Sequence, residues 1–221
     1  MKYVYSPDTT AVIKYLTETI SSHLVAGEKV LWILSGGSGG IVCAEVSKQL
    51  TGPLDNLVTT LSDERFVPLG DPDENWQQLI DSGFSVPGAT VYRPIQSADR
   101  ATTAANLGKW MEEQFPLADY RIGLFGVGVD GHIGGLKPGT TAVEATGWAT
   151  DFTGDDFERI TMTFNAIKHL DEVVLQAMGT DKTAVIDQIL HSDMPITTQP
   201  AQILKTFDKS TIFTDYKETT T

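Results

Sequence analysis

Short apolar runs alternate with helical patterns along most of this chain. A short apolar run bounded by turn residues is typical of a buried strand. Such strands are predicted at Tyr3–Tyr5, Val30–Leu34, Val58–Leu61, Val91–Arg93, Ile122–Gly126, Arg159–Phe164, Glu172–Ala177 and Thr211–Thr214. Apolar residues spaced by three and four positions predict helices over Thr9–Leu24 and Ala184–Leu190. The alternation predicts an α/β fold, a doubly wound and mostly parallel sheet flanked by helices, which is a Rossmann-like architecture.

The composition favours a globular chain with an acidic surface. The 221 residues are 41% apolar and no linker divides them, so residues 1–221 are predicted to form a single domain, with a frayed tail from Glu218 to Thr221. A formal charge of −13 and a pI near 4.6 argue against nucleic acid or an anionic membrane as a partner. The first residues lack the apolar core of a signal peptide, and no run is long enough to span a bilayer, so a cytoplasmic location is predicted. Cys43, the lone cysteine, is predicted to pack as a small apolar residue on a helix.

The stretch RIGLFGVGVDGHIGGLKPGT, residues 121–140, carries the strongest chemical signal. Its apolar start predicts a strand, and Asp130 and His132 lie in the glycine-rich loop that follows. In open α/β sheets ligands bind outside the carboxyl ends of the strands, where titratable pairs are often functional. A histidine exchanges protons near neutral pH, and a neighbouring carboxylate orients its ring or stabilises its cation. The competing interpretation is an ordinary turn with a solvated histidine.

The same loop also has the glycine spacing of a dinucleotide-binding fingerprint. Gly126, Gly128 and Gly131 match it, and an acid follows at Asp151. That fingerprint needs a helix to begin at its third glycine, whereas the glycines and the proline that follow would break a helix here. Nicotinamide binding and hydride transfer are therefore not favoured.

A second glycine-rich loop, Ser35–Gly40, follows the strand Val30–Leu34 and precedes a helix predicted over Ile41–Leu50. Glycines allow backbone N–H groups to converge on an anion, and a helix N-terminus adds partial positive charge. Gly36, Gly37 and Ser38 are therefore predicted to bind a phosphate. The lysine of a P-loop is absent, and a merely flexible turn is the alternative.

A third motif, SDERFVP at residues 62–68, follows the strand Val58–Leu61, and DPDENW comes soon after it. The second segment imitates the start of a calcium loop but lacks its glycine and its final glutamate, so a calcium site is rejected. Arg65 at a strand end suits a phosphate or carboxylate contact. Arg159 and Lys182 also lie at element boundaries and are candidate anion ligands. The alternative for each is an ordinary surface charge.

Taken together, the ordered segments LSGGSGG, SDERFVP with DPDENW, GVGVDGHIGGLKPG, and RITMTF followed by GTDK resemble the 6-phosphogluconolactonase and glucosamine-6-phosphate deaminase superfamily. They span Leu34 to Lys182. Within this superfamily the sequence looks closer to the lactonases, because deaminases typically carry tyrosine where Arg65 stands and glutamate where Lys137 stands. It departs from the lactonase pattern at Gly39, Gly40 and Gly134–Lys137, which puts the pocket contour in question.

The resemblance implies hydrolysis of 6-phosphoglucono-δ-lactone in the oxidative pentose phosphate pathway, with no metal and no organic cofactor. His132 would be the general base that activates water, and Asp130 would orient it. The phosphate and the rest of the substrate would be held by Gly36, Gly37, Ser38, Asp63, Arg65, Arg159 and Lys182. The alternatives are a glucosamine-6-phosphate deaminase, with Asp63 as its base, and a non-catalytic sugar-phosphate sensor. We expect the protein to bind a small sugar phosphate as its substrate. We also expect it to be a monomer or a weak homodimer.

Overall fold

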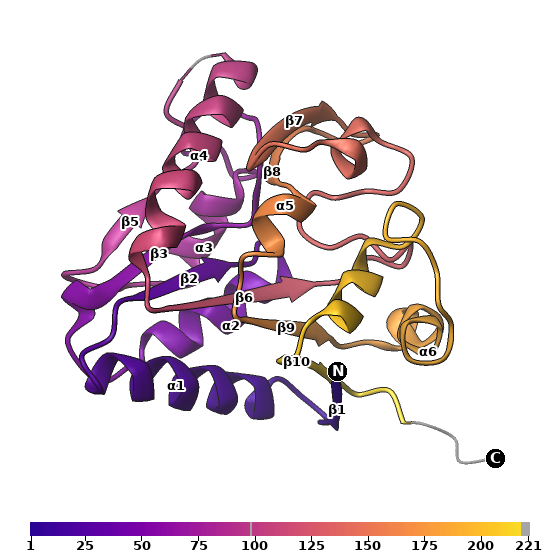
Figure 1. Ribbon diagram of the computed structural model, residues 1–221, viewed down its shortest axis with the longest axis horizontal. Coiled ribbons are helices and arrows are strands. Elements are labelled where there is room, and N and C mark those ends of the chain that lie inside the picture. Colours follow the sequence, from indigo (N-terminus) through magenta and orange to yellow (C-terminus); the bar gives the residue numbers. More distant parts are fainter. Residues whose placement is uncertain (98, 218–221) are drawn as a thin grey trace.

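A parallel sheet forms the centre of the protein (Figure 1). The computed structural model describes residues 1–97 and 99–217, so the predicted tail at Glu218–Thr221 lies outside the described residues. Within these residues seven strands pair in the order β1-β10-β9-β6-β2-β3-β5, and every pair is parallel. The α/β fold with a doubly wound sheet is confirmed.

The elements have the following bounds. The strands of the large sheet are β1 (Lys2–Tyr5), β2 (Val30–Leu34), β3 (Leu57–Leu61), β5 (Thr90–Tyr92), β6 (Tyr120–Gly126), β9 (Glu172–Ala177) and β10 (Ser210–Thr214). A small antiparallel sheet contains β4 (Asp63–Arg65), β8 (Glu158–Met162) and β7 (Ala149–Thr153), in that order. The α-helices are α1 (Thr10–Val25), α2 (Ser38–Ser47), α3 (Asn75–Asp81), α4 (Arg100–Gln114), α5 (Phe164–Ile167) and α6 (Thr183–His191). Short 3₁₀ turns include Thr180–Lys182 and Pro200–Thr206.

Alternate residues of the central strands enter two separate hydrophobic cores. On β2, Val30, Trp32 and Leu34 pack with apolar residues of α1, α2 and α3 on one face of the sheet. Leu31 and Ile33 point to the other face, where α4, α5, α6 and the small sheet supply the partners. In Figure 1, α1 and α2 lie below the sheet and α5 lies above it. Burial on both faces explains why these strands are continuous apolar runs in the sequence.

The four central strands deliver the four sequence motifs to one edge of the sheet. Because β9, β6, β2 and β3 are adjacent and parallel, their carboxyl ends lie side by side. The chain leaves β2 toward β3 on one side and later returns to place β6 on the other side. The junction of β2 and β6 is thus a topological switch point, where the loops separate and leave a crevice.

Several predicted boundaries differ from the observed ones, and two of the differences affect the site. The helix predicted from Ile41 begins at Ser38, because Gly37, with φ of 55°, turns the chain sharply and Gly39 approaches the Ser35 side chain. A Cβ on Gly39 would lie 2.5 Å from Ser35 Oγ, so glycine allows the first turn to form there.

The strand predicted at Arg159–Phe164 ends at Met162, because the Thr163 side chain caps α5, which begins at Phe164. This strand, β8, also lies outside the large sheet and pairs antiparallel with β4 and β7. An apolar run predicts a strand but does not say which strand it pairs with.

Cys43 is fully buried on α2, as predicted, and burial raises the pKa of its thiol to about 12. Only a thiolate reacts rapidly with disulfide reagents. We expect no stoichiometric labelling of the native protein at pH 8, and labelling of one thiol per chain after denaturation. Rapid labelling of the native protein would contradict this burial.

None of the helices in the described part of the chain combines the length and the apolar character that crossing a bilayer requires.

Candidate active site

A polar cavity of about 260 Å³ opens at the carboxyl edge of the sheet, over β2 and β6. Eight of the nine residues predicted from the sequence line it: Gly36, Gly37, Ser38, Asp63, Arg65, His132, Arg159 and Lys182. The ninth, Asp130, contacts the His132 ring from behind. The structure therefore brings together four motifs that are spread over most of the sequence.

His132 and Asp130 form a hydrogen-bonded pair. Nδ1 of the ring lies 2.6 Å from Asp130 Oδ1, and the same oxygen accepts the His132 backbone N–H at 3.2 Å. Partial burial acts to raise the pKa of Asp130, but the charge of His132 and these hydrogen bonds outweigh it and lower that pKa below its usual value. Asp130 is therefore an anion at neutral pH. In the neutral tautomer with its proton on Nδ1, the carboxylate accepts that proton and Nε2 carries the lone pair.

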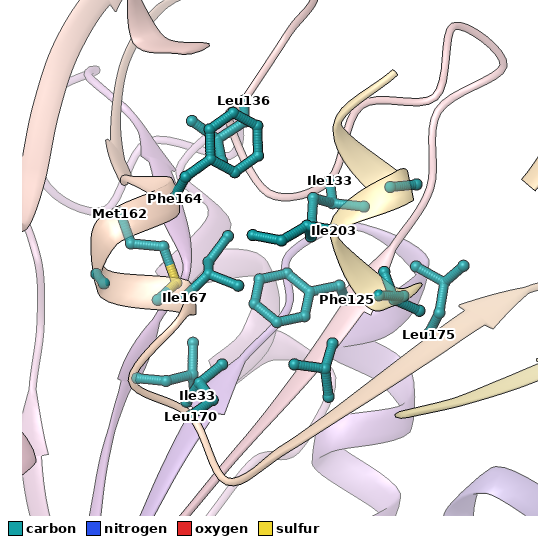
Figure 2. Packing of buried hydrophobic residues seen from close by; sticks show 14 of the residues in the cluster. Ile33, Phe125, Ile133, Leu136, Met162, Phe164, Ile167, Leu170, Leu175 and Ile203 are labelled. Carbon is teal, nitrogen blue, oxygen red and sulfur yellow. The ribbon is translucent and has the colours of Figure 1, made fainter. Parts of the chain in front are cut away.

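The backbone around His132 is held on both sides. Before it, the Gly131 N–H donates to the Gly128 carbonyl and the Gly128 N–H donates to the His132 carbonyl, both at 2.9 Å. After it, Ile133 and Leu136 are fully buried and pack into the core with Phe125, Phe164 and Ile203 (Figure 2). The loop is thus anchored by apolar side chains on either side of the Gly134–Gly135 pair, which holds the backbone that carries the ring in place.

This loop does not continue into a helix, as a dinucleotide-binding loop would. Residues 127–140 contain no α-helix, and Gly131 and Gly134 both have positive φ. Asp151, the acid at the expected spacing, lies on β7 and pairs with Arg100 at 2.7 Å. The rejection of the nicotinamide interpretation agrees with this geometry.

The start of α2 forms one wall of the cavity. Gly36 passes so close to Asn75 that a Cβ would lie 2.7 Å from that side chain, and Gly37 carries no side-chain cap for the helix. In the described structure the first N–H groups of α2 therefore have no capping side chain, and they add the partial positive charge of the helix N-terminus. This arrangement suits an anionic group.

Three cationic side chains line the cavity, and each has an acidic neighbour. Arg65 donates to the Asp73 carbonyl oxygen at 3.2 Å, and Lys182 lies 3.3 Å from Asp181. Arg159 lies 3.5 Å from Asp63. Asp63 also accepts a hydrogen bond from Ser62 at 2.9 Å and is almost fully buried. The cations are thus held by partners while remaining at the cavity wall.

Lys137, one of the departures from the lactonase pattern, does not line the cavity. Its ammonium lies 3.7 Å from Asp156, which also accepts a 2.8 Å hydrogen bond from Arg159. Gly135 is required where it stands, because a Cβ there would lie 2.7 Å from Thr161 Cβ. The space that a side chain on Gly135 would need is thus filled by the Thr161 side chain.

The contacts of Asp156 predict that it stabilises the turn between β7 and β8 except at strongly acidic pH. Partial burial acts to raise the pKa of Asp156, but the hydrogen bond and charge of Arg159 lower it to about 2. Because the folded-state pKa is below the unfolded value of about 3.9, this stabilisation is full above pH 4 and is lost as the pH falls through about 2. Titration of the Asp156 carboxyl by NMR should give a pKa near 2. A value near 4 would contradict the ion pair.

Sequence reasoning missed several residues in the cavity wall or beside it. Asn75, which lines the cavity and donates to the Asp63 carbonyl at 3.2 Å, belongs to the segment that imitates a calcium loop. Glu64 is fully buried and accepts N–H groups of Arg65, Asn75 and Trp76, so it ties the Arg65 strand to the start of α3. Burial raises the pKa of Glu64 to about 8 against the effect of these hydrogen bonds. Ser35 and Gln176 also line the cavity.

No group of three or more histidine, cysteine, aspartate or glutamate side chains is placed to hold a metal ion in residues 1–97 and 99–217. The titratable side chains that line the cavity are those of Asp63, Arg65, His132, Arg159 and Lys182.

Comparisons with known proteins agree with this geometry. A 6-phosphogluconolactonase of Mycobacterium leprae is 31% identical over 195 residues, which cover 78% of this chain and 77% of that protein. A crystal structure of a 6-phosphogluconolactonase from Shewanella baltica superposes with a TM-score of 0.80 at 21% identity, covering 96% of both chains. A monomeric glucosamine-6-phosphate deaminase gives a TM-score of 0.77 at 16% identity, covering 97% of both chains. Structural likeness at these identities shows the fold, which both kinds of enzyme share.

The family itself is shown by the match of nearly the whole chain to one family model. Residues 8–213 match the model described as glucosamine-6-phosphate isomerases/6-phosphogluconolactonase. The matched region contains the strands from β2 to β9, the cavity and each of the predicted site residues. The chain therefore belongs to the glucosamine-6-phosphate isomerase/6-phosphogluconolactonase family.

Proposed function

We propose that this enzyme is a 6-phosphogluconolactonase, which hydrolyses 6-phosphoglucono-δ-lactone to 6-phosphogluconate in the oxidative pentose phosphate pathway. The observation that carries the proposal is the Asp130–His132 pair, with its 2.6 Å contact, in a cavity that also holds three cations and a helix N-terminus. The pair is suited to proton transfer, and the cations with the start of α2 are suited to an anion. The names of the curated relatives support the same activity.

The phosphate would bind where positive charge gathers. The N-terminus of α2 at Gly37 and Ser38 supplies backbone donors, and Arg65, Arg159 and Lys182 supply full charges. A phosphate monoester is dianionic near neutral pH and accepts several hydrogen bonds, so it suits such a mixture of donors. The net charge of −13 makes these local cations important, because the chain as a whole repels an anion.

His132 would act first as a base and then as an acid. Nε2 removes a proton from water as its oxygen attacks the lactone carbonyl carbon, which gives a tetrahedral intermediate. The bond from that carbon to the ring oxygen then breaks, and the imidazolium returns its proton to the departing oxygen. Asp130 stabilises the imidazolium between the two steps, as its ionised state and contact with Nδ1 allow. The products are the open-chain acid, which ionises, and the unchanged enzyme.

Two features favour the lactonase over the deaminase. Deaminases carry a glutamate at the position of Lys137, so this chain lacks the carboxylate that would act on the histidine there. Lys137 itself pairs with Asp156 and does not line the cavity. Asp63, the candidate base of a deaminase, is engaged by Ser62 and Arg159. Both oxygens of the Asp63 carboxylate therefore already have partners, Oδ1 in Ser62 and Oδ2 in Arg159.

The proposal is tested by assaying the protein with two substrates side by side. Freshly prepared 6-phosphoglucono-δ-lactone should be hydrolysed well above its spontaneous rate, and glucosamine 6-phosphate should release no ammonia. Ammonia release without lactone hydrolysis would make the protein a deaminase. Tight binding of 6-phosphogluconate with neither activity would point to a sugar-phosphate sensor.

A further inference from the structure

The turn between β7 and β8 contacts two of the three cavity cations. Arg65 on β4 and Arg159 on β8 face each other directly in the antiparallel pairing of these strands. Beside them, the half-buried ring of Phe157 lies 4.6 Å from the Arg65 guanidinium carbon and 5.8 Å from that of Arg159. Both distances fall within the range of cation–π attraction. One aromatic ring is thus shared by two guanidinium groups.

Such an arginine pair needs stabilisation. Like charges directly opposite each other on neighbouring strands repel. In the described structure the Nε atoms of both arginines are buried and have no hydrogen-bond acceptor. Their terminal nitrogens are only partly satisfied, by Asp73 for Arg65 and by Asp156 and Asp63 for Arg159. The electron-rich face of Phe157 offsets part of the repulsion between the two arginines without neutralising either charge.

We propose that Phe157 is a positioning residue for phosphate recognition. Its ring supports both guanidinium groups at the cavity wall and leaves their positive charge available to a phosphate monoester. A carboxylate at the same place would neutralise that charge. The inference rests on the proposed function and extends it to a residue that does not line the cavity.

The geometry of the turn is consistent with this role. The Gly154 N–H donates to the Phe157 carbonyl at 2.9 Å and closes the turn, and β8 begins at the next residue, Glu158. Phe157 and Arg159 are two positions apart on an extended segment, so their side chains point to the same face. The turn therefore places the ring and the charge together by local geometry, and β4 brings Arg65 to the same ring.

The test compares Phe157→Leu with Phe157→Tyr, on a phosphorylated and an unphosphorylated lactone. Phe157→Leu keeps apolar bulk but removes the π face, so KM for 6-phosphoglucono-δ-lactone should rise by roughly 2- to 30-fold. The kcat for this substrate should change little, as should kcat/KM for glucono-δ-lactone. Phe157→Tyr should behave like the wild type. Phe207→Leu, which changes a partly buried phenylalanine outside the cavity, is the matched control.

Calorimetric binding of 6-phosphogluconate and of inorganic phosphate separates this inference from the proposed function. If the wild type binds them but hydrolyses neither lactone, the proposed function fails while the loss of affinity in Phe157→Leu still supports the role of the ring. The inference is overturned if Phe157→Leu binds both anions like the wild type. It is also overturned by an equal loss on both lactones, which would indicate a general structural role, or by a wild type that binds neither anion.

Discussion

Replacing His132 with alanine is expected to lower kcat for lactone hydrolysis by roughly 10²- to 10⁴-fold, the usual contribution of a positioned acid–base group. The variant loses the only histidine that lines the cavity in the described structure, and with it the nitrogen that exchanges protons with water and the ring oxygen. Affinity for 6-phosphogluconate should change little, because the cations and the start of α2 are untouched. The measurement is the initial rate with fresh lactone after subtraction of spontaneous hydrolysis.

His191→Ala is the matched control, because this histidine lies at the end of α6 with about half of its side chain exposed and does not line the cavity. It should retain wild-type activity. Thermal unfolding of both variants near the wild-type temperature would show that the fold is intact. If His132→Ala hydrolyses the lactone within a few-fold of the wild-type rate, the general-base mechanism is wrong even though the substrate stands.

Replacing Gly128 with alanine is expected to reduce kcat/KM by roughly 10²-fold, the scale of loss when a reacting group is misplaced by about 1 Å. A Cβ at this position would lie 2.1 Å from His132 Nδ1 and 2.5 Å from Asp130 Oδ1. The ring and the carboxylate would have to separate, so His132 would lose both its orientation and its partner. Gly128 does not have positive φ, so the effect comes from the side-chain clash rather than from backbone strain.

The same substitution should change the free energy of unfolding by no more than about 1 kcal/mol, because His132 is partly exposed and its ring can turn toward solvent. Gly147→Ala serves as the control, since a Cβ there meets its nearest neighbour at an ordinary 3.6 Å and Gly147 does not line the cavity. A fully active Gly128→Ala enzyme, with an unshifted His132 ring signal by NMR, would refute the proposed dependence on the Asp130–His132 pair.

Much of the site was predictable because its motifs follow apolar strands. The residues after β2, β3, β6 and β9 share one edge of the sheet once those strands are parallel, and parallel pairing follows from the alternation of strands and helices. Gly37, His132 and Lys182 were therefore identifiable without coordinates, and Asp63 followed from the family resemblance. The single-domain organisation, the cytoplasmic location, the absence of a nucleic-acid partner and the monomeric or weakly dimeric state stay predictions.

Other parts of the site depend on contacts between segments far apart in the chain. The pairing of β4 with β8 sets Arg65 opposite Arg159. A short apolar run predicts a strand but does not show which strand it pairs with, so this pairing could not be predicted from the sequence. The same holds for Asn75, which α3 brings against Gly36, and for Asp156, which binds both Lys137 and Arg159. Local pattern carries no information on such pairs.

Hydrophobic periodicity and glycine-rich turns are local properties, so the amino-acid sequence is enough to predict the α/β class, the parallel sheet and which chemical groups follow each strand. Three features needed the folded structure: α2 begins at Ser38, a second, antiparallel sheet carries two of the cations, and Phe157 lies beside both arginines. These features arise from close approach between distant segments, where packing and charge choose among partners that the local sequence permits equally.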